Sequence, residues 1–124
     1  MKKAISTTAA PGAIGPYSQA IDTGTFVYAS GQIPVDPATG LIPEGIEAQT
    51  AQSLANVKAI LAEAGLTTDN VVKTIVFLHD IADFAAMNAV YATAFTEPYP
   101  ARSAVAVRDL PKGVLVEIEV IACR

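Results

Sequence analysis

An arginine and two glutamates near the end of the chain are the residues best suited to chemistry on a small molecule. Arg102 follows Pro98 and Pro100 and is itself followed by small side chains, which leaves room for a ligand beside its guanidinium group. A guanidinium group binds a carboxylate through two parallel hydrogen bonds, which a lysine would not reproduce. Glu117 and Glu119 alternate with apolar residues, so both carboxylates lie on one face of a predicted strand. Repulsion between them raises the pKa of one, as suits a site that handles water and protons.

These three residues also have a purely structural interpretation. Arg102 could be a surface arginine or the ion-pair partner of Glu117 or Glu119, and the glutamates could lie on a solvated strand edge. The spacing of the residues leaves both interpretations open.

The segment that holds the arginine and the glutamates is predicted to form a β-hairpin. Its strands are residues 103–107 and 114–122, and the Pro and Gly of residues 109–113 are typical of a tight connection. In such a hairpin Arg102 would lie about three residues along the strand from the partner of Glu117, or roughly 10 Å away. A substrate, a water molecule or a neighbouring subunit would have to bridge that gap.

Four other residues lie in settings that suit a binding pocket. Tyr17 is the large polar side chain of the Pro- and Gly-rich segment 9–18, where it either anchors the loop on the core or delivers a phenol to a pocket. Gly31, beside the hydroxyl of Ser30, lies inside a predicted strand, where a glycine marks a bulge or the close approach of another group. Asn88 borders the apolar stripe of a predicted helix, so it is either a satisfied helix residue or a ligand contact.

The single histidine and the single cysteine argue against other kinds of catalytic site. Cys123 can form neither an intrachain disulfide nor a thiolate cluster, and a metal at His79 would have to recruit carboxylates or another subunit. We therefore expect no catalytic metal. His79 ends an apolar strand beside Asp80, and a structural hydrogen bond there is favoured over a catalytic triad.

The composition describes a single domain that is poor in charge. Charged residues make up 16% of the chain, against about 25% in a typical soluble domain, which indicates that another subunit covers part of the surface. The net charge of −4 and the lack of a basic block argue against a nucleic-acid partner. Gly and Pro interrupt every apolar run before the roughly 18 residues of a spanning helix, and residues 1–10 lack the apolar region of a signal peptide. We therefore predict one cytoplasmic domain over residues 1–124, with no membrane partner.

The hydrophobic pattern predicts two helices among several strands. A helical period covers residues 46–64 and ends at Gly65, and a second helix begins at Asp80 or Asp83 and runs to about Thr96. Strands are predicted at residues 3–7, 26–35, 71–78, 103–107 and 114–122. The third of these strands is apolar on both faces, which is typical of a central strand covered on each side.

This order of elements predicts an α+β fold. We expect a two-layer sandwich in which a mixed sheet of five or six strands carries both helices on one face. The other face of the sheet is expected to pack against other subunits.

Four motifs occur in order along nearly the full length of the chain. They are Gly15-Pro16-Tyr17-Ser18-Gln19-Ala20, Ala29-Ser30-Gly31-Gln32-Ile33-Pro34, Asn56-Val57-Lys58-Ala59-Ile60-Leu61, and Pro100-Ala101-Arg102-Ser103 continuing to Glu117-Ile118-Glu119. Together they resemble the RidA/YjgF family, the reactive intermediate deaminases that are also called 2-iminobutanoate/2-iminopropanoate deaminases. The last motif is the family signature, with the arginine and the glutamate at the family spacing.

The resemblance implies a chorismate-mutase-like fold assembled as a homotrimer, with three pockets at the subunit interfaces. It implies an enzyme that hydrolyses 2-imino acids, or enamine tautomers such as 2-aminoacrylate, to 2-keto acids and ammonia. Pyridoxal-phosphate dehydratases acting on serine or threonine release these enamines, and the deaminase itself needs no cofactor. Imine hydrolysis requires carboxylate recognition, a positioned water and proton transfers, which an arginine, a carboxylate and a phenol can supply.

The resemblance also implies roles for individual residues. Arg102 would hold the substrate carboxylate, Glu117 would position or activate the attacking water, and Tyr17 would line the pocket. Further pocket positions fall on Ser30, Gly31 and Asn88.

One departure from the family pattern lies two residues after the arginine. Many members have a cysteine where this chain has Ala104. The backbone N–H of Ala104 can still bind the substrate, so hydrolysis need not depend on the thiol. Regulation through that thiol is put in doubt, because Cys123 lies at the end of the last strand and does not replace it.

Two other functions stay open at this point. The same pocket would suit a module that senses small 2-keto acids without turnover. Some relatives have been described as ribonucleases or translation inhibitors, but the acidic balance of the chain and the lone His79 argue against RNA chemistry.

Overall fold

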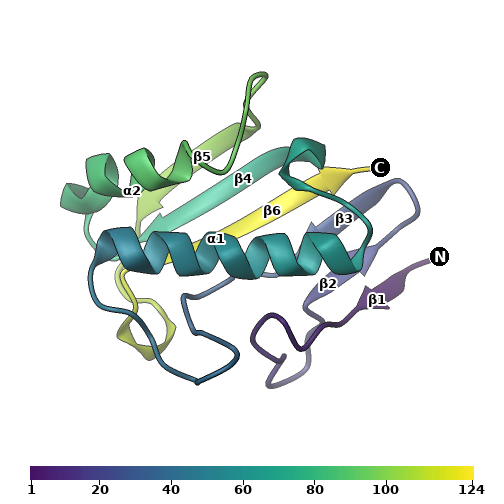
Figure 1. Cartoon of the computed structure of the whole chain (residues 1–124), viewed down its shortest axis with the longest axis horizontal. Coiled ribbons are helices and arrows are strands. Elements are labelled where there is room, and N and C mark those ends of the chain that lie inside the picture. Colours follow the sequence, from purple (N-terminus) through teal and green to yellow (C-terminus); the bar gives the residue numbers. More distant parts are fainter.

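A mixed six-stranded sheet forms the centre of this computed structural model, which describes residues 1–124. The strands are β1 (Lys3–Ile5), β2 (Ala20–Asp22), β3 (Phe26–Ala29), β4 (Val71–Leu78), β5 (Ala101–Ala106) and β6 (Val116–Cys123). They lie in the order β1-β2-β3-β6-β4-β5, and only the pair β4–β5 is parallel (Figure 1). The prediction of a mixed sheet with five or six strands is confirmed.

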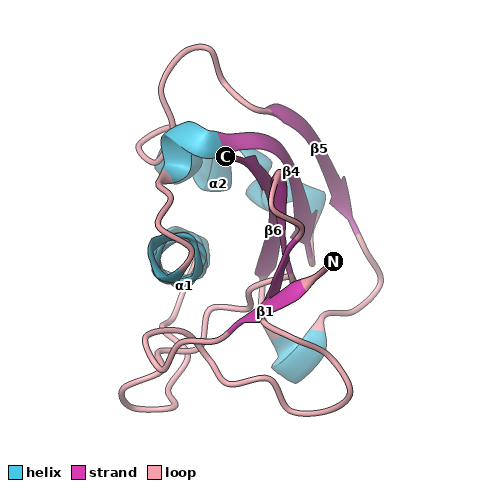
Figure 2. Ribbon diagram, turned by 90° about the vertical axis from the view of Figure 1, so that its right-hand side faces the viewer, coloured by secondary structure: helices cyan, strands magenta, loops and turns pink.

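Two helices lie on one face of this sheet. They are α1 (Ile46–Glu63) and α2 (Phe84–Tyr91). Figure 2 shows α1 end-on to one side of the strands. The first helix ends as predicted, with Ala64 as its C-cap followed by Gly65 at φ 76°, a conformation in which a glycine is unstrained. The predicted two-layer α+β arrangement is therefore confirmed.

The second helix is shorter than predicted, because it ends at Tyr91 and not near Thr96. Beyond Tyr91 the chain turns so that the side chains of Ala94 and Phe95 enter the core. Asp80 caps the short 3₁₀ helix Ile81–Asp83, where its carboxylate accepts a hydrogen bond from the N–H of Ala82.

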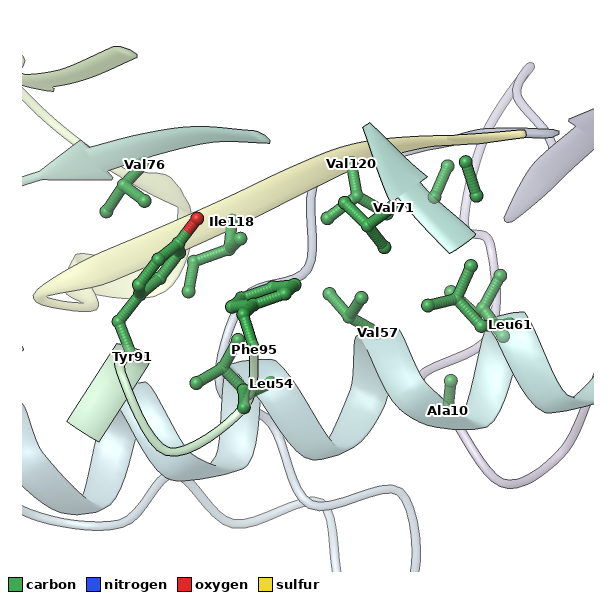
Figure 3. Packing of buried hydrophobic residues seen from close by; sticks show 14 of the residues in the cluster. Ala10, Leu54, Val57, Leu61, Val71, Val76, Tyr91, Phe95, Ile118 and Val120 are labelled. Atoms are coloured by element: carbon green, nitrogen blue, oxygen red, sulfur yellow. The ribbon is translucent and has the colours of Figure 1, made fainter. Parts of the chain in front are cut away.

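The hydrophobic core lies between the helices and the sheet. Figure 3 shows Leu54, Val57 and Leu61 of α1 pointing toward Ile118 and Val120 of β6. Along β6 buried and half-buried residues alternate strictly, because successive side chains of a strand point to opposite faces. The half-buried residues of β6, which include both glutamates, therefore lie on the face that carries no helix.

The predicted β-hairpin is wrong, because β4 lies between β5 and β6. Strand β4 pairs in parallel with β5 and antiparallel with β6, so it uses both of its edges. The passage from β4 through α2 to β5 is a β-α-β crossover, which brings two parallel strands together. Val105 and Glu117 are nevertheless aligned across β4, since Phe77 is the register partner of both.

Three other strand predictions need correction. The strand predicted over residues 26–35 ends at Ala29 and continues only as an isolated bridge between Gln32 and Ile118. Strand β2 was not predicted, because three residues give too short a pattern. Strand β4 is covered by helices on one face only, and on its other face Val72 is 45% exposed.

No helix of this structure is both long enough and apolar enough to cross a membrane.

Candidate active site

Arg102 lies on the edge strand β5 and points toward α2. Its Nη1 donates a 2.6 Å hydrogen bond to Oδ1 of Asn88. Its Cζ lies 4.7 Å from the centre of the Tyr91 ring and 5.4 Å from that of Phe84, within the range of cation–π attraction. Nε and Nη2 make no hydrogen bond within the chain, so this edge of the guanidinium group is free to bind a carboxylate.

A cavity of about 470 Å³ opens beside this guanidinium group. Its lining residues, which we call the arginine half-site, are Asn88, Tyr91, Ala92, Tyr99, Pro100 and Arg102. Two of these residues, Asn88 and Arg102, were predicted from the sequence as site residues, and the structure brings them together.

Ala104 lies two residues further along the same strand. Its side chain packs against the core, so it faces the same side of the sheet as Arg102. The N–H of Val107 donates to the carbonyl of Leu78 on β4. Because successive N–H groups of a strand point to opposite sides, that of Ala104 points away from β4 toward the open edge. A ligand at this edge can therefore accept a hydrogen bond from it.

Glu117 lies on the opposite face of the sheet. Burial raises the pKa of its half-buried carboxyl, and repulsion from Glu119 adds to the increase. The predicted repulsion therefore acts on Glu117, but it is secondary to burial. No hydrogen bond or ion pair within the chain satisfies the carboxylate of Glu117 or that of Glu119. The carboxylate of Glu117 is thus free to bind a partner or a water molecule.

Gly31 is in close contact with this carboxylate. A Cβ atom built on Gly31 would lie 2.9 Å from Cδ of Glu117 and closer still to its Oε2. A side chain at position 31 would therefore displace the carboxylate. This glycine was predicted to mark either a bulge or the close approach of another group, and the second alternative is confirmed.

Ser30 is held by hydrogen bonds to the preceding loop. Its N–H donates to the carbonyl of Gln19 at 2.9 Å, and its hydroxyl donates to the carbonyl of Ser18 at 2.6 Å. The hydroxyl therefore anchors the loop that leads to Gly31, and only its remaining lone pairs are open to a ligand.

Tyr17 lies on the loop before β2 and is 52% exposed. Its hydroxyl accepts a long hydrogen bond of 3.4 Å from the N–H of Ile14. Together with Gly31 it lines a cavity of about 720 Å³. We call Tyr17, Ser30, Gly31 and Glu117 the glutamate half-site.

The two half-sites do not meet within one chain. Arg102 is the register partner of Thr74 on β4, whereas Glu117 is the register partner of Phe77. Strand spacings place their Cα atoms roughly 14 Å apart, and their side chains point to opposite faces. The estimate of roughly 10 Å from the hairpin is therefore wrong. The alternative of an ion pair between Arg102 and Glu117 or Glu119 is wrong as well, since neither pair forms.

Three buried polar residues that support the half-sites were missed by the sequence analysis. Gln19 binds backbone groups of Thr7 and Pro11 at 2.7 Å each and thereby fixes the loop that carries Tyr17. Asn56 of α1 donates to the carbonyls of Ile33 and Val35 at 3.1 and 3.0 Å, just beyond Gly31. The ring of Tyr91 lies against the guanidinium group of Arg102. Gln19 and Asn56 both occur in the four motifs quoted from the sequence, so their presence in these motifs could have identified them.

His79 has no role in either half-site. Its side chain is exposed and makes no hydrogen bond with Asp80, whose carboxylate caps the following 3₁₀ helix instead. The structural hydrogen bond predicted at this position is found only in the backbone, where the N–H of His79 donates to the carbonyl of Leu115 at 3.0 Å.

The sequence of the chain matches a known protein family and known relatives. Residues 7–124 match the model of the family described as endoribonuclease L-PSP. The chain is 55% identical over 127 residues to the 2-iminobutanoate/2-iminopropanoate deaminase of Salmonella typhimurium, a match that covers 100% of this chain and 99% of the relative.

Solved structures show the same fold. A protein of unknown function of the Rid family from Yersinia pestis superposes with a TM-score of 0.97 at 52% identity, over 100% of both chains. The structure of Escherichia coli TdcF with bound serine superposes with a TM-score of 0.94 at 52% identity, over 98% of both chains.

Proposed function

The chain belongs to the endoribonuclease L-PSP family, and from this membership and its two half-sites we propose that it is a hydrolytic deaminase of small 2-imino acids. The resemblance to RidA/YjgF proteins is confirmed by relatives that carry the deaminase and Rid names. The observation that carries the proposal is the 55% identity, over the full length, to the 2-iminobutanoate/2-iminopropanoate deaminase of Salmonella typhimurium.

The reaction adds water to the C=N bond of the substrate. The water oxygen bonds to C2, the resulting carbinolamine loses ammonia, and a 2-keto acid remains. Both protons of the water move to the nitrogen, the first when water adds and the second when the carbinolamine hydroxyl loses its proton as ammonia departs, so a group that exchanges protons near neutral pH is useful. Serine or threonine dehydratases that use pyridoxal phosphate are the proposed source of such imines.

Arg102 is proposed to bind the substrate carboxylate through Nε and Nη2, since Nη1 is occupied by Asn88. The N–H of Ala104 at the open strand edge is proposed to add a hydrogen bond to the ligand. The serine bound to the similar TdcF structure supports a small ligand that bears a carboxylate.

Glu117 is proposed to accept each of the two water protons in turn from the oxygen and to pass it to the nitrogen. Its raised pKa supports this role, because the raised value brings the carboxyl closer to the working pH of such an exchange. Gly31 leaves the space that this carboxylate occupies, and Tyr17 is proposed to close the cavity over the substrate.

The complete site is proposed to form between subunits of a homotrimer in the cytoplasm. Arg102 and Glu117 face opposite sides of one sheet, so a single chain does not present both to one substrate. A neighbouring copy that brings its glutamate half-site to the arginine half-site would complete the pocket. The face of the sheet that carries no helix, with Val72 and Val105 each 45% exposed, is a suitable surface for such an assembly.

A coupled assay tests the proposal. Threonine and a pyridoxal-phosphate threonine dehydratase generate 2-iminobutanoate, and release of 2-oxobutanoate is followed with and without this protein. We expect the wild type to accelerate release and Arg102→Ala to abolish the effect. An unchanged rate with the wild type, or full activity in Arg102→Ala, would overturn the proposal. Pyruvate binding without acceleration would instead favour the 2-keto-acid-sensing function.

A further inference from the structure

We propose that Tyr91, held by Thr74, is a positioning residue that fixes the plane in which Arg102 presents its free edge to a carboxylate. This inference rests on the proposed function to the extent that Arg102 is assigned to the substrate carboxylate. It concerns a pair of residues that do not themselves need to contact the substrate.

Tyr91, Thr74 and Arg102 form a closed triangle on the helix-bearing face of the sheet. Thr74 on β4 is the register partner of Arg102 on β5, so the two side chains lie next to each other on the same face. The hydroxyl groups of Thr74 and Tyr91 are 2.8 Å apart and form a hydrogen bond. The Tyr91 ring in turn lies 4.7 Å from Cζ of Arg102.

Tyr91 is rigid. The residue is 6% exposed and Thr74 is fully buried, so their hydrogen bond is shielded from water. The ring of Phe95 packs against that of Tyr91, with centroids 4.7 Å apart. The ring cannot swing out into solvent without breaking this buried hydrogen bond, and its packing against Phe95 opposes rotation of the ring about its own axis.

A fixed plane matters for Arg102 because a free arginine side chain has many rotamers. Two-point binding of a carboxylate requires both N–H vectors to lie in one plane with it. The hydrogen bond to Asn88 fixes one corner of the guanidinium group, but it leaves the group free to swing about that corner. The Tyr91 ring removes this freedom, and the edge formed by Nε and Nη2 then points in one direction. Preorganisation of this kind strengthens binding without a new contact to the ligand.

Three variants and two measurements test this inference. The measurements are the affinity for pyruvate, by calorimetry, and the kcat and KM of the coupled deaminase assay. In Tyr91→Leu, which removes the platform, we expect both Kd for pyruvate and KM to rise about tenfold, with kcat changed by less than about twofold. Tyr91→Phe keeps the ring and should raise KM by only about twofold. Thr74→Val should behave like Tyr91→Phe.

The control is Val57→Ala, which removes buried atoms from α1 in the same core and leaves Arg102 untouched. It should lower the melting temperature and leave KM and Kd unchanged. If Tyr91→Leu only lowers the melting temperature, as this control does, Tyr91 is structural and the inference is wrong.

A second comparison covers the case in which Tyr91→Leu folds poorly. In an Arg102→Lys background there is no planar fork to orient, so Tyr91→Phe and Thr74→Val should no longer raise Kd for pyruvate. Equal effects in the two backgrounds would overturn the inference. If the wild type binds pyruvate but hydrolyses no imine, the proposed function fails while the pyruvate measurements still decide the role of Tyr91.

Discussion

The carboxyl of Glu117 is the group on which the proposed chemistry depends most strongly. Burial and the charge of Glu119 both raise its pKa, so the folded chain binds this proton more tightly than the unfolded chain. The stability that Glu117 contributes is therefore fully present below the ordinary pKa of glutamate, and it is lost as pH rises through the raised value. Ionisation of Glu117 therefore costs the folded chain some stability, which is common for catalytic groups.

Glu119→Gln should shift the pH dependence of activity. The substitution removes the neighbouring negative charge, so the pKa of Glu117 falls, while the contribution of burial remains. Because the ionised form accepts the proton of water, the acid limb of the kcat/KM profile should move to lower pH. The plateau should keep its height to within about twofold, since Glu119 has no assigned contact with the substrate. An acid limb at the wild-type pH would show that another group controls it.

Gly31→Ala should lower the activity and leave the stability of the fold nearly unchanged. The new methyl group would occupy the space of the Glu117 carboxylate, which is the far end of a flexible side chain and can swing away. We expect a change in unfolding free energy of less than about 1 kcal/mol, but a fall in kcat of at least about tenfold, because the base is displaced. Gly12→Ala, at a glycine with open space around it, is the matched control and should alter neither quantity. A Gly31→Ala enzyme with normal kcat would argue against Glu117 as the base.

The sequence indicated these residues to different degrees. The chemical types of Arg102 and Glu117 made them candidates, and the approach to Gly31 was predicted from a glycine in a strand. Tyr91 was not predicted as a site residue, because its hydroxyl is satisfied by Thr74 from a different element. Such a pairing depends on the tertiary structure, so no local pattern reveals it.

At the scale of elements, the loop that carries Tyr17 depends on one buried amide. Gln19 accepts from the N–H of Thr7 and donates to the carbonyls of Thr7 and Pro11, so it closes the loop from residues 7 to 19. A segment rich in Gly and Pro has few hydrogen bonds of its own, and without this amide its backbone groups would lose their partners.

Gln19→Ala should therefore loosen this loop. We expect a loss of about 2 kcal/mol in unfolding free energy, since buried backbone groups are left unsatisfied. Hydrogen exchange of the amides in residues 7–17 should become faster than in the wild type, and this increase should be larger than any increase in β4 and β6. Gln52→Ala, which removes a partly buried amide from the surface of α1, is the control and should leave exchange in the loop unchanged. Wild-type exchange in the loop of Gln19→Ala would show that other contacts hold Tyr17.

The error in the predicted hairpin also belongs to the scale of elements. Pro111 and Gly113 form a 3₁₀ turn between β5 and β6, as their turn signals indicate. These signals give the presence of a turn, but not whether the strands on either side of it pair with each other. The parallel pairing of β4 with β5 arises from the crossover through α2, a long-range contact that local patterns do not encode. The helix α1 was predicted closely because its period and its C-terminal glycine are local.

At the scale of the whole molecule, the chain presents the two proposed halves of its site in different directions. The shortage of charge in the sequence predicted that another subunit covers part of the surface. The structure adds a reason for such an assembly, since Arg102 and Glu117 lie on opposite faces of the sheet. If the site is shared, each pocket takes its arginine from one subunit and its glutamate from the next.

Mixing two inactive variants tests this arrangement. Arg102→Ala keeps an intact glutamate half-site, and Glu117→Ala keeps an intact arginine half-site. In trimers formed at random from equal amounts, a pocket is complete when a Glu117→Ala subunit supplies the arginine and an Arg102→Ala subunit supplies the glutamate. The two chances of one half multiply, so about a quarter of the pockets should be active.

The experiment is best done by co-expression with two affinity tags, so that mixed trimers are isolated before the deaminase assay. Trimers of either single variant are the controls and should be inactive. If both residues acted on one substrate within a single chain, no mixed trimer would contain a complete site. Mixed trimers as inactive as the two controls would therefore refute the shared pocket. Each isolated mixed trimer has one complete pocket out of three, so recovery of about a third of the wild-type rate would assign Arg102 and Glu117 to different subunits of the same site.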